Sequence, residues 1–406
     1  MRFMIKGLVV ASAGFALLAT PAVAADYQDE MREMRDLVLQ LQDQVQTQQE
    51  QINVQQDVLQ DAGLENERGS ASMMSSFLSS TDFSGHVATS YIYNANEPAS
   101  AGAGENTGGG LANLFHGEDQ SFQLDEVWMT VDRAATAESG AGFHFEVVYG
   151  ATAGAQADGG LVWIPEANIS YATPWGPTVT AGKIGTTIGI EKANSTQNAN
   201  ITRGLTYSLQ PRSHTGFTVS GDMGGISYTL GAVNGVGTAD PDGNNAKGFL
   251  WGLGMGDDST SLSFNGIYSD KNAAGNSAYL LDLVAEHNVS DSLSLSVNLD
   301  YNTAEAGATD PWAIALSIGS RLAISDDLGV GGRFELLHTD ADDVADTETD
   351  TYSVTVTSDY ALADNLTWKC EVSYLTADDA TPFADDSTSG TSDDVWLLGT
   401  QLTYSF

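Results

Sequence analysis

The chain ends in the segment Asp394 to Phe406, DVWLLGTQLTYSF, in which large apolar residues recur at every second position apart from Thr400. These residues are Trp396, Leu398, Leu402, Tyr404 and Phe406. Side chains two residues apart lie on one face of a strand, so the segment predicts a strand with an aromatic-rich apolar face. A terminal strand leaves an open edge unless it pairs, and membrane barrels remove that edge by pairing the first strand with the last. The segment therefore favours a closed transmembrane β-barrel over its alternative, an edge strand of a soluble sandwich.

The first 24 residues are typical of a secretory signal peptide. Arg2 and Lys6 precede an apolar run over residues 7–19, and the small residues Ala22-Val23-Ala24 follow at the spacing that a signal peptidase requires. The apolar run is too short to span a bilayer stably, and no later segment approaches eighteen consecutive apolar residues. Barrel strands alternate in polarity and do not raise the average hydropathy, so the sequence still permits a membrane protein.

The composition is that of a barrel with a hydrated interior. The chain has 43 glycines, one cysteine and a formal net charge of −39. Such an acidic balance argues against nucleic acid as a partner, because nucleic-acid binding requires basic patches. The single Cys370 permits no intramolecular disulfide. The six histidines are scattered without the spacing of metal ligands, so the sequence predicts no metal site and no cofactor.

Residues 25–68 differ from the rest of the chain in having almost no glycine and many glutamines. Apolar residues recur there in alternating steps of three and four, which predicts an α-helical coiled coil in the periplasm. The expected core positions are Met31, Val38, Val45, Ile52 and Leu59. So narrow an apolar stripe implies partner chains, although a single solvated helix or a disordered spacer is the alternative. The Ser-rich residues 69–80 then predict a linker.

The remainder, residues 81–406, predicts an antiparallel barrel of about sixteen strands. Alternating stretches bounded by Gly, Asn, Asp and Pro begin near residues 82, 119, 141, 163, 178, 213, 226, 247, 259, 277, 292, 311, 328, 350, 366 and 394. Connections that follow even-numbered strands are short, and those that follow odd-numbered strands are mostly long. Short periplasmic turns, long extracellular loops and an even strand count are typical of bacterial outer-membrane barrels, with both termini in the periplasm.

Charged residues on these strands lie opposite the apolar face. A charge that faces lipid near the bilayer midplane costs about 2–4 kcal/mol, so the charged faces are expected to point into the barrel. The lumen-facing residues predicted in this way are Arg321, Arg333, Glu335, Lys369 and Glu371. A polar interior of mixed charge indicates a water-filled channel.

The connection over residues 188–212 concentrates the positive charge of the barrel, which has only ten Lys and Arg in all. We expect this loop to fold inward and narrow the pore, with charges that set a weak ion selectivity. The predicted constriction residues are Lys183, Glu191, Lys192, Arg203 and Arg212. The alternative is an ordinary extracellular loop with exposed bases.

Several segments resemble the putative outer-membrane β-barrel porins of the second type. They are QLDEVWMTVDR (123–133), GFHFEVVYG (142–150), AGKIGTTIGIEKANSTQNANITRGL (181–205) and HTGFTVSG (214–221). The resemblance implies a porin for passive diffusion of small hydrophilic solutes or ions in the outer membrane of a Gram-negative bacterium. The predicted coiled coil favours a homotrimer, because trimeric porins offer three parallel N-termini near one axis. Contact with outer-membrane lipids and lipopolysaccharide is also expected. The C-terminal Phe406 resembles the signal that the barrel-assembly machinery reads in such proteins.

Two other functions are open at this stage. The coiled coil would make the chain a structural tether if it linked the barrel to the cell wall. An outer-membrane hydrolase would need a Ser–His pair, and neither His144 nor His214 is accompanied by a nucleophile motif. The sequence therefore predicts a channel and not an enzyme, and it names no solute.

Overall fold

The computed structural model describes residue 47 and residues 77–96, 120–156, 160–237, 245–270, 276–305, 310–340, 348–378, 380–384 and 390–406. The chain divides into two compact units, Met1–Ser79 and Ser80–Phe406. Except for Thr47, the predicted signal peptide and coiled coil lie outside the described residues, including Met31, Val38, Val45, Ile52 and Leu59. Of the predicted linker, only residues 77–80 are described, and residues 77–79 are helical. No helix among the described residues has the length and apolar character needed to cross a membrane.

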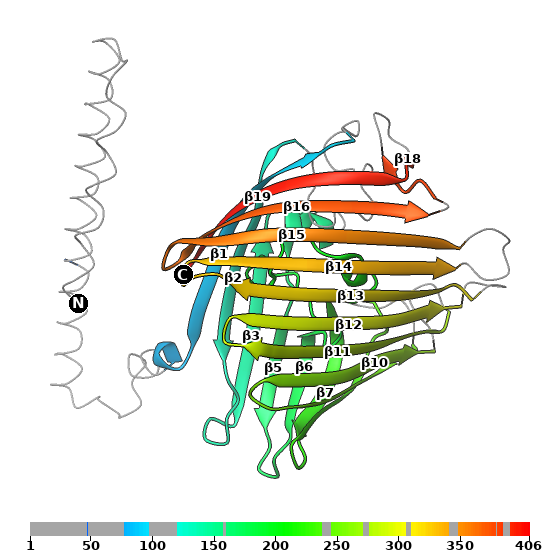
Figure 1. Cartoon of the computed structure of the whole chain (residues 1–406). Coiled ribbons are helices and arrows are strands. Elements are labelled where there is room, and N and C mark those ends of the chain that lie inside the picture. The colour runs from blue at the N-terminus through cyan, green and yellow to red at the C-terminus, as the bar shows by residue number, and fades with distance from the viewer. Residues whose placement is uncertain are drawn as a thin grey trace. The chain divides into compact units, whose positions relative to one another are not determined.

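The second unit is a closed antiparallel barrel of sixteen strands with one extra strand (Figure 1). The wall strands are β1 (Asp82–Asn94), β2 (Phe122–Arg133), β3 (Ala141–Tyr149), β5 (Ala167–Ala172), β6 (Thr178–Gly185), β7 (Ser213–Asp222), β8 (Ile226–Val233), β9 (Gly248–Gly256), β10 (Thr260–Ser269), β11 (Ala278–Ser290), β12 (Leu293–Ala304), β13 (Trp312–Ala323), β14 (Leu328–Asp340), β15 (Thr349–Ala363), β16 (Leu366–Asp378) and β19 (Asp394–Ser405). Each pairs with its neighbours along the chain, and β19 pairs with β1. The predicted strand starts lie within four residues of the observed ones, so the all-β barrel is confirmed.

The barrel closes where the last residue of the chain meets β1. The backbone of Phe406 and the backbone of Gly85 exchange two hydrogen bonds of 2.8 and 3.0 Å. A Cβ atom at position 85 would lie 2.8 Å from the Phe406 ring, so only glycine leaves room for the ring there. The terminal aromatic residue is thus part of the seam that removes the open edge.

The short elements that the alternation pattern missed lie outside the regular wall. The extra strand β4 (Val162–Trp163) pairs with β3 and is separated from β5 by residues 164–166. The sequence predicted one strand starting near residue 163, whereas the structure has the short β4 there and the wall strand β5 four residues later. Pro165, which has no N–H to donate to a ladder, lies in the break between them. A small hairpin of β17 (Phe383–Ala384) and β18 (Gly390–Ser392) lies in the connection before β19. Helices α3 (Ala151–Gln156), η1 (Ser195–Gln197) and α4 (Leu205–Ser208) complete the described elements.

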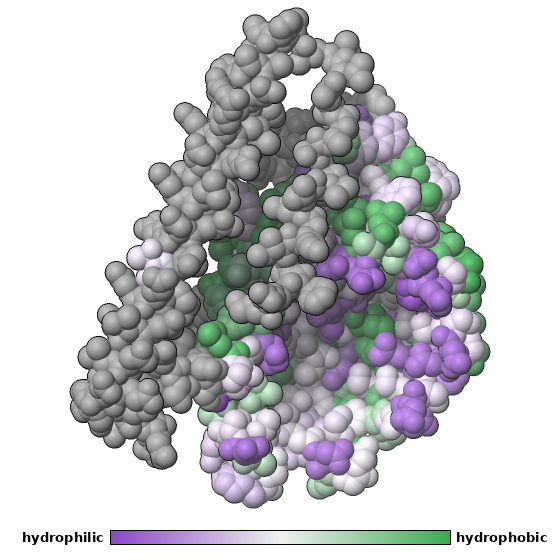
Figure 2. Space-filling view, turned by 90° about the vertical axis from the view of Figure 1, so that its left-hand side faces the viewer, coloured by the Kyte–Doolittle hydropathy of each residue, from purple (hydrophilic) through white to green (hydrophobic). Residues whose placement is uncertain are grey.

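The two faces of the wall have opposite character. Along β13, Ile314, Ile318 and Leu322 are exposed, whereas Ala313 and Ala315, on either side of Ile314, are buried. The buried residues of the barrel include many charged ones, among them Glu126 and Arg333. On the face that Figure 2 shows, hydrophilic residues lie in patches among hydrophobic ones. An apolar outside and a polar inside are what a barrel in a membrane requires.

Candidate functional site: the loop inside the barrel

The connection between β6 and β7, residues 186–212, lies inside the barrel. Its residues hydrogen-bond to inward-facing side chains of five wall strands: Glu126 on β2, Asn298 on β12, Glu335 on β14, Thr357 on β15 and Glu371 on β16. In the closed ring of sixteen strands, β2 and β12 lie on nearly opposite sides. The loop therefore crosses the lumen.

Wall carboxylates hold the loop by its backbone. Glu371 accepts hydrogen bonds from the backbone N–H groups of Ile201 at 2.5 Å and Thr202 at 3.0 Å. Glu335 accepts one from the N–H of Thr206 at 3.2 Å. Hydrogen bonds to an ionised acceptor are stronger than those between neutral groups, so these contacts fix the loop against the wall.

The opposite side of the loop is held in the same way by Glu126. Its carboxylate accepts from the N–H of Ser195 at 3.2 Å and from the Ser195 hydroxyl at 2.8 Å. Thr152, on α3, donates its hydroxyl to the same carboxylate at 3.0 Å. His86 Nε2 lies 2.7 Å from it. Glu126 therefore ties β1, β2, α3 and the loop together.

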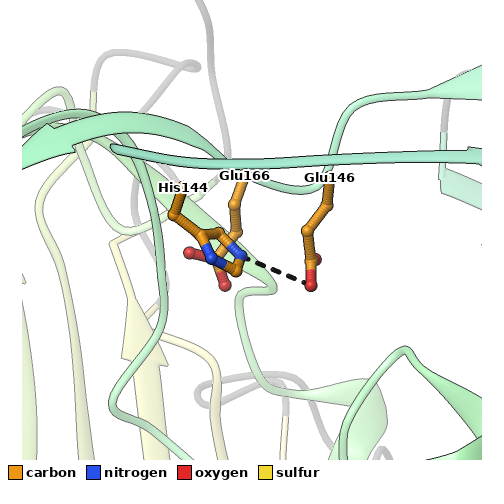
Figure 3. Close-up of side chains that lie close together, drawn as sticks. All are labelled: His144, Glu146 and Glu166. Atoms are coloured by element: carbon orange, nitrogen blue, oxygen red, sulfur yellow. Dashed lines mark ion pairs between the residues drawn. The ribbon is translucent and has the colours of Figure 1, made fainter. Parts of the chain in front are cut away.

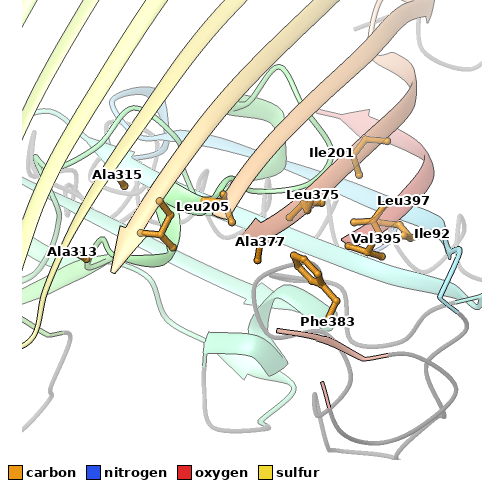
Figure 4. Packing of buried hydrophobic residues seen from close by; sticks show 11 residues of the cluster. Ile92, Ile201, Leu205, Ala313, Ala315, Leu375, Ala377, Phe383, Val395 and Leu397 are labelled. Carbon is orange, nitrogen blue, oxygen red and sulfur yellow. The ribbon is translucent and has the colours of Figure 1, made fainter. Parts of the chain in front are cut away.

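Apolar packing adds to these hydrogen bonds on one side. Ile201 and Leu205 from the loop pack in a buried cluster with residues of the inner wall (Figure 4). The wall residues are Ile92, Ala313, Ala315, Leu337, Leu375, Ala377, Val395 and Leu397, and Phe383 of the β17–β18 hairpin completes the cluster. Burial of two large aliphatic side chains contributes about 1.5–3 kcal/mol each, which stabilises the inward position of the loop.

The asparagine-rich run gives the loop its shape. The Asn194 side chain accepts from the N–H of Thr196 at 2.9 Å and so caps the short helix η1. The side chain of Asn198 accepts from the N–H of Lys192 at 2.8 Å and donates to the Lys192 carbonyl at 2.7 Å. Asn200 donates to the Thr357 hydroxyl at 2.7 Å. The run is a compact, internally bonded turn.

Two arginines of the loop form hydrogen bonds to the loop's own backbone. Arg203 is only 5% exposed and donates to the carbonyls of Lys192 at 2.9 Å and Ile201 at 2.8 Å. Its Nη2 also lies 3.4 Å from a Glu126 oxygen. Arg212 donates to the carbonyl of Tyr207 at 2.7 Å, and its guanidinium lies 3.6 Å from the centre of the Tyr207 ring. Burial raises the pKa of the Tyr207 hydroxyl to about 12, so this ring remains neutral.

Polar cavities remain between the loop and the wall. One, of about 430 Å³, lies against residues of β10 to β14 and the turns beside them, and is lined by Glu286, Arg321 and Arg333. A second, also about 430 Å³, is lined by Arg321, Asp359 and Lys369. The exposed Gln197 of the loop lines both. These lining groups suit water and hydrophilic solutes.

Comparison with known families places this architecture. The family of putative beta-barrel porin-2 proteins, OmpL-like, matches residues 80–406, which is the whole barrel. The chain belongs to this porin family. Its membership indicates an outer-membrane barrel of Gram-negative bacteria. No curated protein matches the porin in sequence.

Solved structures agree with the fold of the porin. OmpTdeltaL8, a loop-deletion mutant of the outer-membrane protein OmpT of Vibrio cholerae, is 12% identical, with a TM-score of 0.57 over 80% of this chain and 99% of that one. The trimer form of OmpT from the same organism is 11% identical, with a TM-score of 0.54 over 80% and 99%. An anion-selective porin from Comamonas acidovorans is 14% identical, with a TM-score of 0.55 over 80% and 99%. At these identities the likeness shows the fold alone.

Within the porin, the residues predicted for the constriction lie in or beside the inward loop. Glu191 accepts from the N–H of Gly204 at 2.7 Å, and Lys192 donates to the carbonyl of Gly189 at 3.1 Å. Lys183 stands on β6, with its amine 6.0 Å from the centre of the Trp163 ring. Arg203 and Arg212 serve the internal fold of the loop, as described above.

The five residues predicted to face the lumen fall into two groups. Arg333 forms ion pairs with Glu191 at 2.6 Å and with Glu335 at 3.0 Å. Lys369 donates to the carbonyl of Asn198 at 2.6 Å, and Glu371 holds the loop backbone. Arg321 instead pairs with Asp359 of β15 at 2.6 Å. Four of the five thus contact the loop, and Arg321 lines the cavities beside it.

Other groups that hold the loop were not found from the sequence. Gln210 donates to Asn298 at 2.9 Å and to Asp300 at 2.7 Å, and Asn298 donates to Asp282 at 2.7 Å. The polar residues at every second position of β12 were the available signal, but nothing in the sequence pairs them with Gln210. The hydrogen bonds of Glu126 to the loop could not be predicted either, because its partner Ser195 lies 69 residues away in the chain.

Proposed function

We propose that this porin is a passive diffusion channel for small hydrophilic solutes, narrowed by the loop over residues 188–212. The observation that supports it best is the path of the loop, which crosses the lumen and hydrogen-bonds to strands on nearly opposite sides. A loop held across a polar lumen limits the size of the solutes that pass. The remaining space is lined by groups that can hydrogen-bond to water and polar solutes.

Ion selectivity is expected to be weak and slightly in favour of cations. Two of the bases that the sequence suggested for attracting anions are engaged within the protein: Arg203 lies beside the Glu126 carboxylate, and Arg212 donates to the carbonyl of Tyr207. Burial lowers the pKa of Lys192 in the loop, and the charge of Asp282 opposes that effect. The net charge of −39 enriches cations near the mouths, and this contribution is screened over about 8–10 Å at physiological salt. Cation preference should therefore appear at low salt and fade as salt rises.

The proposal is tested by reconstituting the folded protein in planar bilayers and in liposomes. Discrete conductance steps are expected, together with liposome swelling in small sugars but not in large ones. Reversal potentials at two salt concentrations measure the selectivity. The matched control is the same protein added without refolding. A folded barrel that gives neither steps nor swelling would contradict the channel.

We propose that the protein is not an enzyme. The His144 ring contacts Asp132 at 2.9 Å and Glu146 at 3.4 Å, and these are carboxylates, not a nucleophile. His214 contacts the hydroxyl of Thr186 at 3.0 Å. Turnover of a lipid ester by the folded protein, lost in a Thr186→Ala variant, would instead favour the hydrolase.

The assembly of the porin is part of the same proposal. Phe406 is proposed as the residue that the barrel-assembly machinery reads, and it lies at the seam with Gly85. A homotrimer in contact with lipids and lipopolysaccharide is proposed, in keeping with the trimer form described for OmpT of Vibrio cholerae. Residues 25–68 are proposed to form a periplasmic coiled coil in that trimer, with the cell wall as a further partner. Light scattering of the purified protein and of an excised 26–68 peptide tests this, and monomers of both would contradict it.

A further inference from the structure

A histidine and two glutamates lie together on the inner wall, where Lys192 of the loop interacts electrostatically with Glu166. His144 and Glu146 are two residues apart on β3, so their side chains share the inward face of that strand. Glu166 comes from the break between β4 and β5, which the barrel places beside β3. Figure 3 shows the three side chains close together. One possible ligand atom from each residue lies within 4.8 Å of the others.

We propose that His144, Glu146 and Glu166 bind one divalent transition-metal ion of the zinc type. The distance between His144 Nε2 and the Glu146 oxygen is 3.4 Å. Zinc lies about 2.0–2.2 Å from nitrogen and oxygen ligands, and a tetrahedron of that size has edges of about 3.3–3.6 Å. The pair is therefore already at ligand spacing, and Glu166 needs only a small side-chain movement.

The orientation of His144 supports the proposal. Its Nδ1 lies 2.9 Å from an oxygen of Asp132 on β2. In metal sites, a ligating histidine almost always donates its other ring N–H to such an outer partner, which fixes the tautomer and the ring orientation. With Nδ1–H donated to Asp132, Nε2 is left as the nitrogen that faces the two glutamates.

The charge of the cluster also calls for a cation. Three carboxylates, those of Asp132, Glu146 and Glu166, surround one imidazole, which carries one positive charge at most, and the ammonium of Lys192 adds one more near Glu166. An ion with two positive charges offsets this excess better than a protonated histidine does. Imidazole nitrogen with two carboxylates suits zinc and its neighbours, whereas calcium and magnesium prefer ligand sets made of oxygen.

The backbone around the cluster is built to bring Glu166 close. The N–H of Glu146 donates to the carbonyl of Glu166 at 2.9 Å, although Pro165 breaks the strand just before it. On the other side, a Cβ atom at Gly185 would lie 2.2 Å from a carboxylate oxygen of Glu166. Glycine at position 185 thus leaves the space that the Glu166 carboxylate occupies.

The test is a zinc titration of the full chain, folded in detergent and stripped of metal with a chelator, in competition with a zinc-binding dye. One tight ion per chain is expected. His144→Gln and Glu166→Gln should each weaken binding at least about tenfold, and Asp132→Asn about 10–100-fold. His338→Gln is the matched control, because His338 also contacts a carboxylate, Asp350, at 2.7 Å but is not part of such a cluster among the described residues. Heat-modifiable migration in gels shows that each variant is folded.

Two results would overturn the proposal. The first is wild-type affinity in the folded His144→Gln and Glu166→Gln variants, which would assign the zinc to the acidic surface. The second needs no variant. Cobalt bound to the wild-type protein at a site with few ligands should absorb visible light much more strongly than hydrated cobalt, and a spectrum unchanged from that of the hydrated ion would contradict the site.

Discussion

Removal of the Glu371 carboxylate is the single change that is expected to weaken the docking of the inward loop most. Besides the N–H groups of Ile201 and Thr202, Glu371 accepts from the Thr202 hydroxyl at 2.5 Å and the Thr357 hydroxyl at 2.7 Å. A hydrogen bond to a charged group is worth about 1.5–3 kcal/mol, so the two backbone bonds alone contribute about 3–6 kcal/mol to the docking of the loop. Water in the lumen can hydrogen-bond to the freed N–H groups, so the expected loss of docking free energy is at the lower end of this range, about 3 kcal/mol.

The expected consequence of Glu371→Ala is a more mobile loop in an intact barrel. A loss of about 3 kcal/mol raises the population of displaced loop conformations about 100-fold, since every 1.4 kcal/mol is a factor of ten. Single-channel recordings should then show a higher mean conductance and larger current fluctuations than the wild type. The apolar contacts of Ile201 remain, so folding of the barrel is expected to be unchanged.

The matched control is Glu286→Ala. It removes the same charge from the lining of the cavity beside the loop. The Glu286 side chain hydrogen-bonds to Ser261 of the wall at 3.3 Å and acts on the loop through its electrostatic attraction for Lys192. The control should change selectivity slightly but leave the current fluctuations as they are. Equal conductance and equal fluctuations in the two variants would refute the anchoring of the loop by Glu371.

Three further perturbations test other parts of the account. Deletion of Phe406 should lower the heat-modifiable folded fraction in the outer membrane, because the seam loses its two hydrogen bonds to Gly85, and normal folded yield would argue against its role in assembly. Ile318 is 44% exposed on the outer face, so Ile318→Lys should lower the free energy of unfolding in lipid by about 2–4 kcal/mol, measured with denaturant. Ser317→Lys places the charge on the inner face and should not show this loss. Equal losses in the two variants would contradict the assigned faces. Lys192→Gln should shift the reversal potential toward cations, and an unshifted potential would place Lys192 outside the permeation path.

The barrel could be predicted because each wall strand carries its own evidence. In β13, the alternation of Ile314, Leu316 and Ile318 with Ala313 and Ala315 is visible in a dozen residues, and pairing with the next strand follows from a short turn. The break at Pro165 escaped the same reasoning, because the alternation continues across it and only the missing N–H separates β4 from β5. Local patterns predict strands well and interruptions poorly.

The functional site could be predicted only in outline. The density of charge in residues 183–212 pointed to the right loop, yet the partners of that charge are distant in sequence. Arg203 meets Glu126 across 77 residues, and Arg333 meets Glu191 across 142. Glu166 joins His144 and Glu146 only because β5 pairs with β3. Such contacts form only when the barrel closes, and the spacing of nearby residues in the sequence does not predict them.

The central claim is that solutes pass the inward loop, and cysteine modification at Gln197 tests it most directly. Gln197 is exposed and lines both polar cavities, and the native Cys370 is replaced by serine in the test protein. During single-channel recording, a bulky charged thiol reagent should reduce the current of the Gln197→Cys channel in discrete steps. The same reagent should leave the current of Val356→Cys unchanged, because Val356 is exposed on the outer face. An unchanged current through a Gln197→Cys protein that mass spectrometry shows to be fully modified would contradict the account.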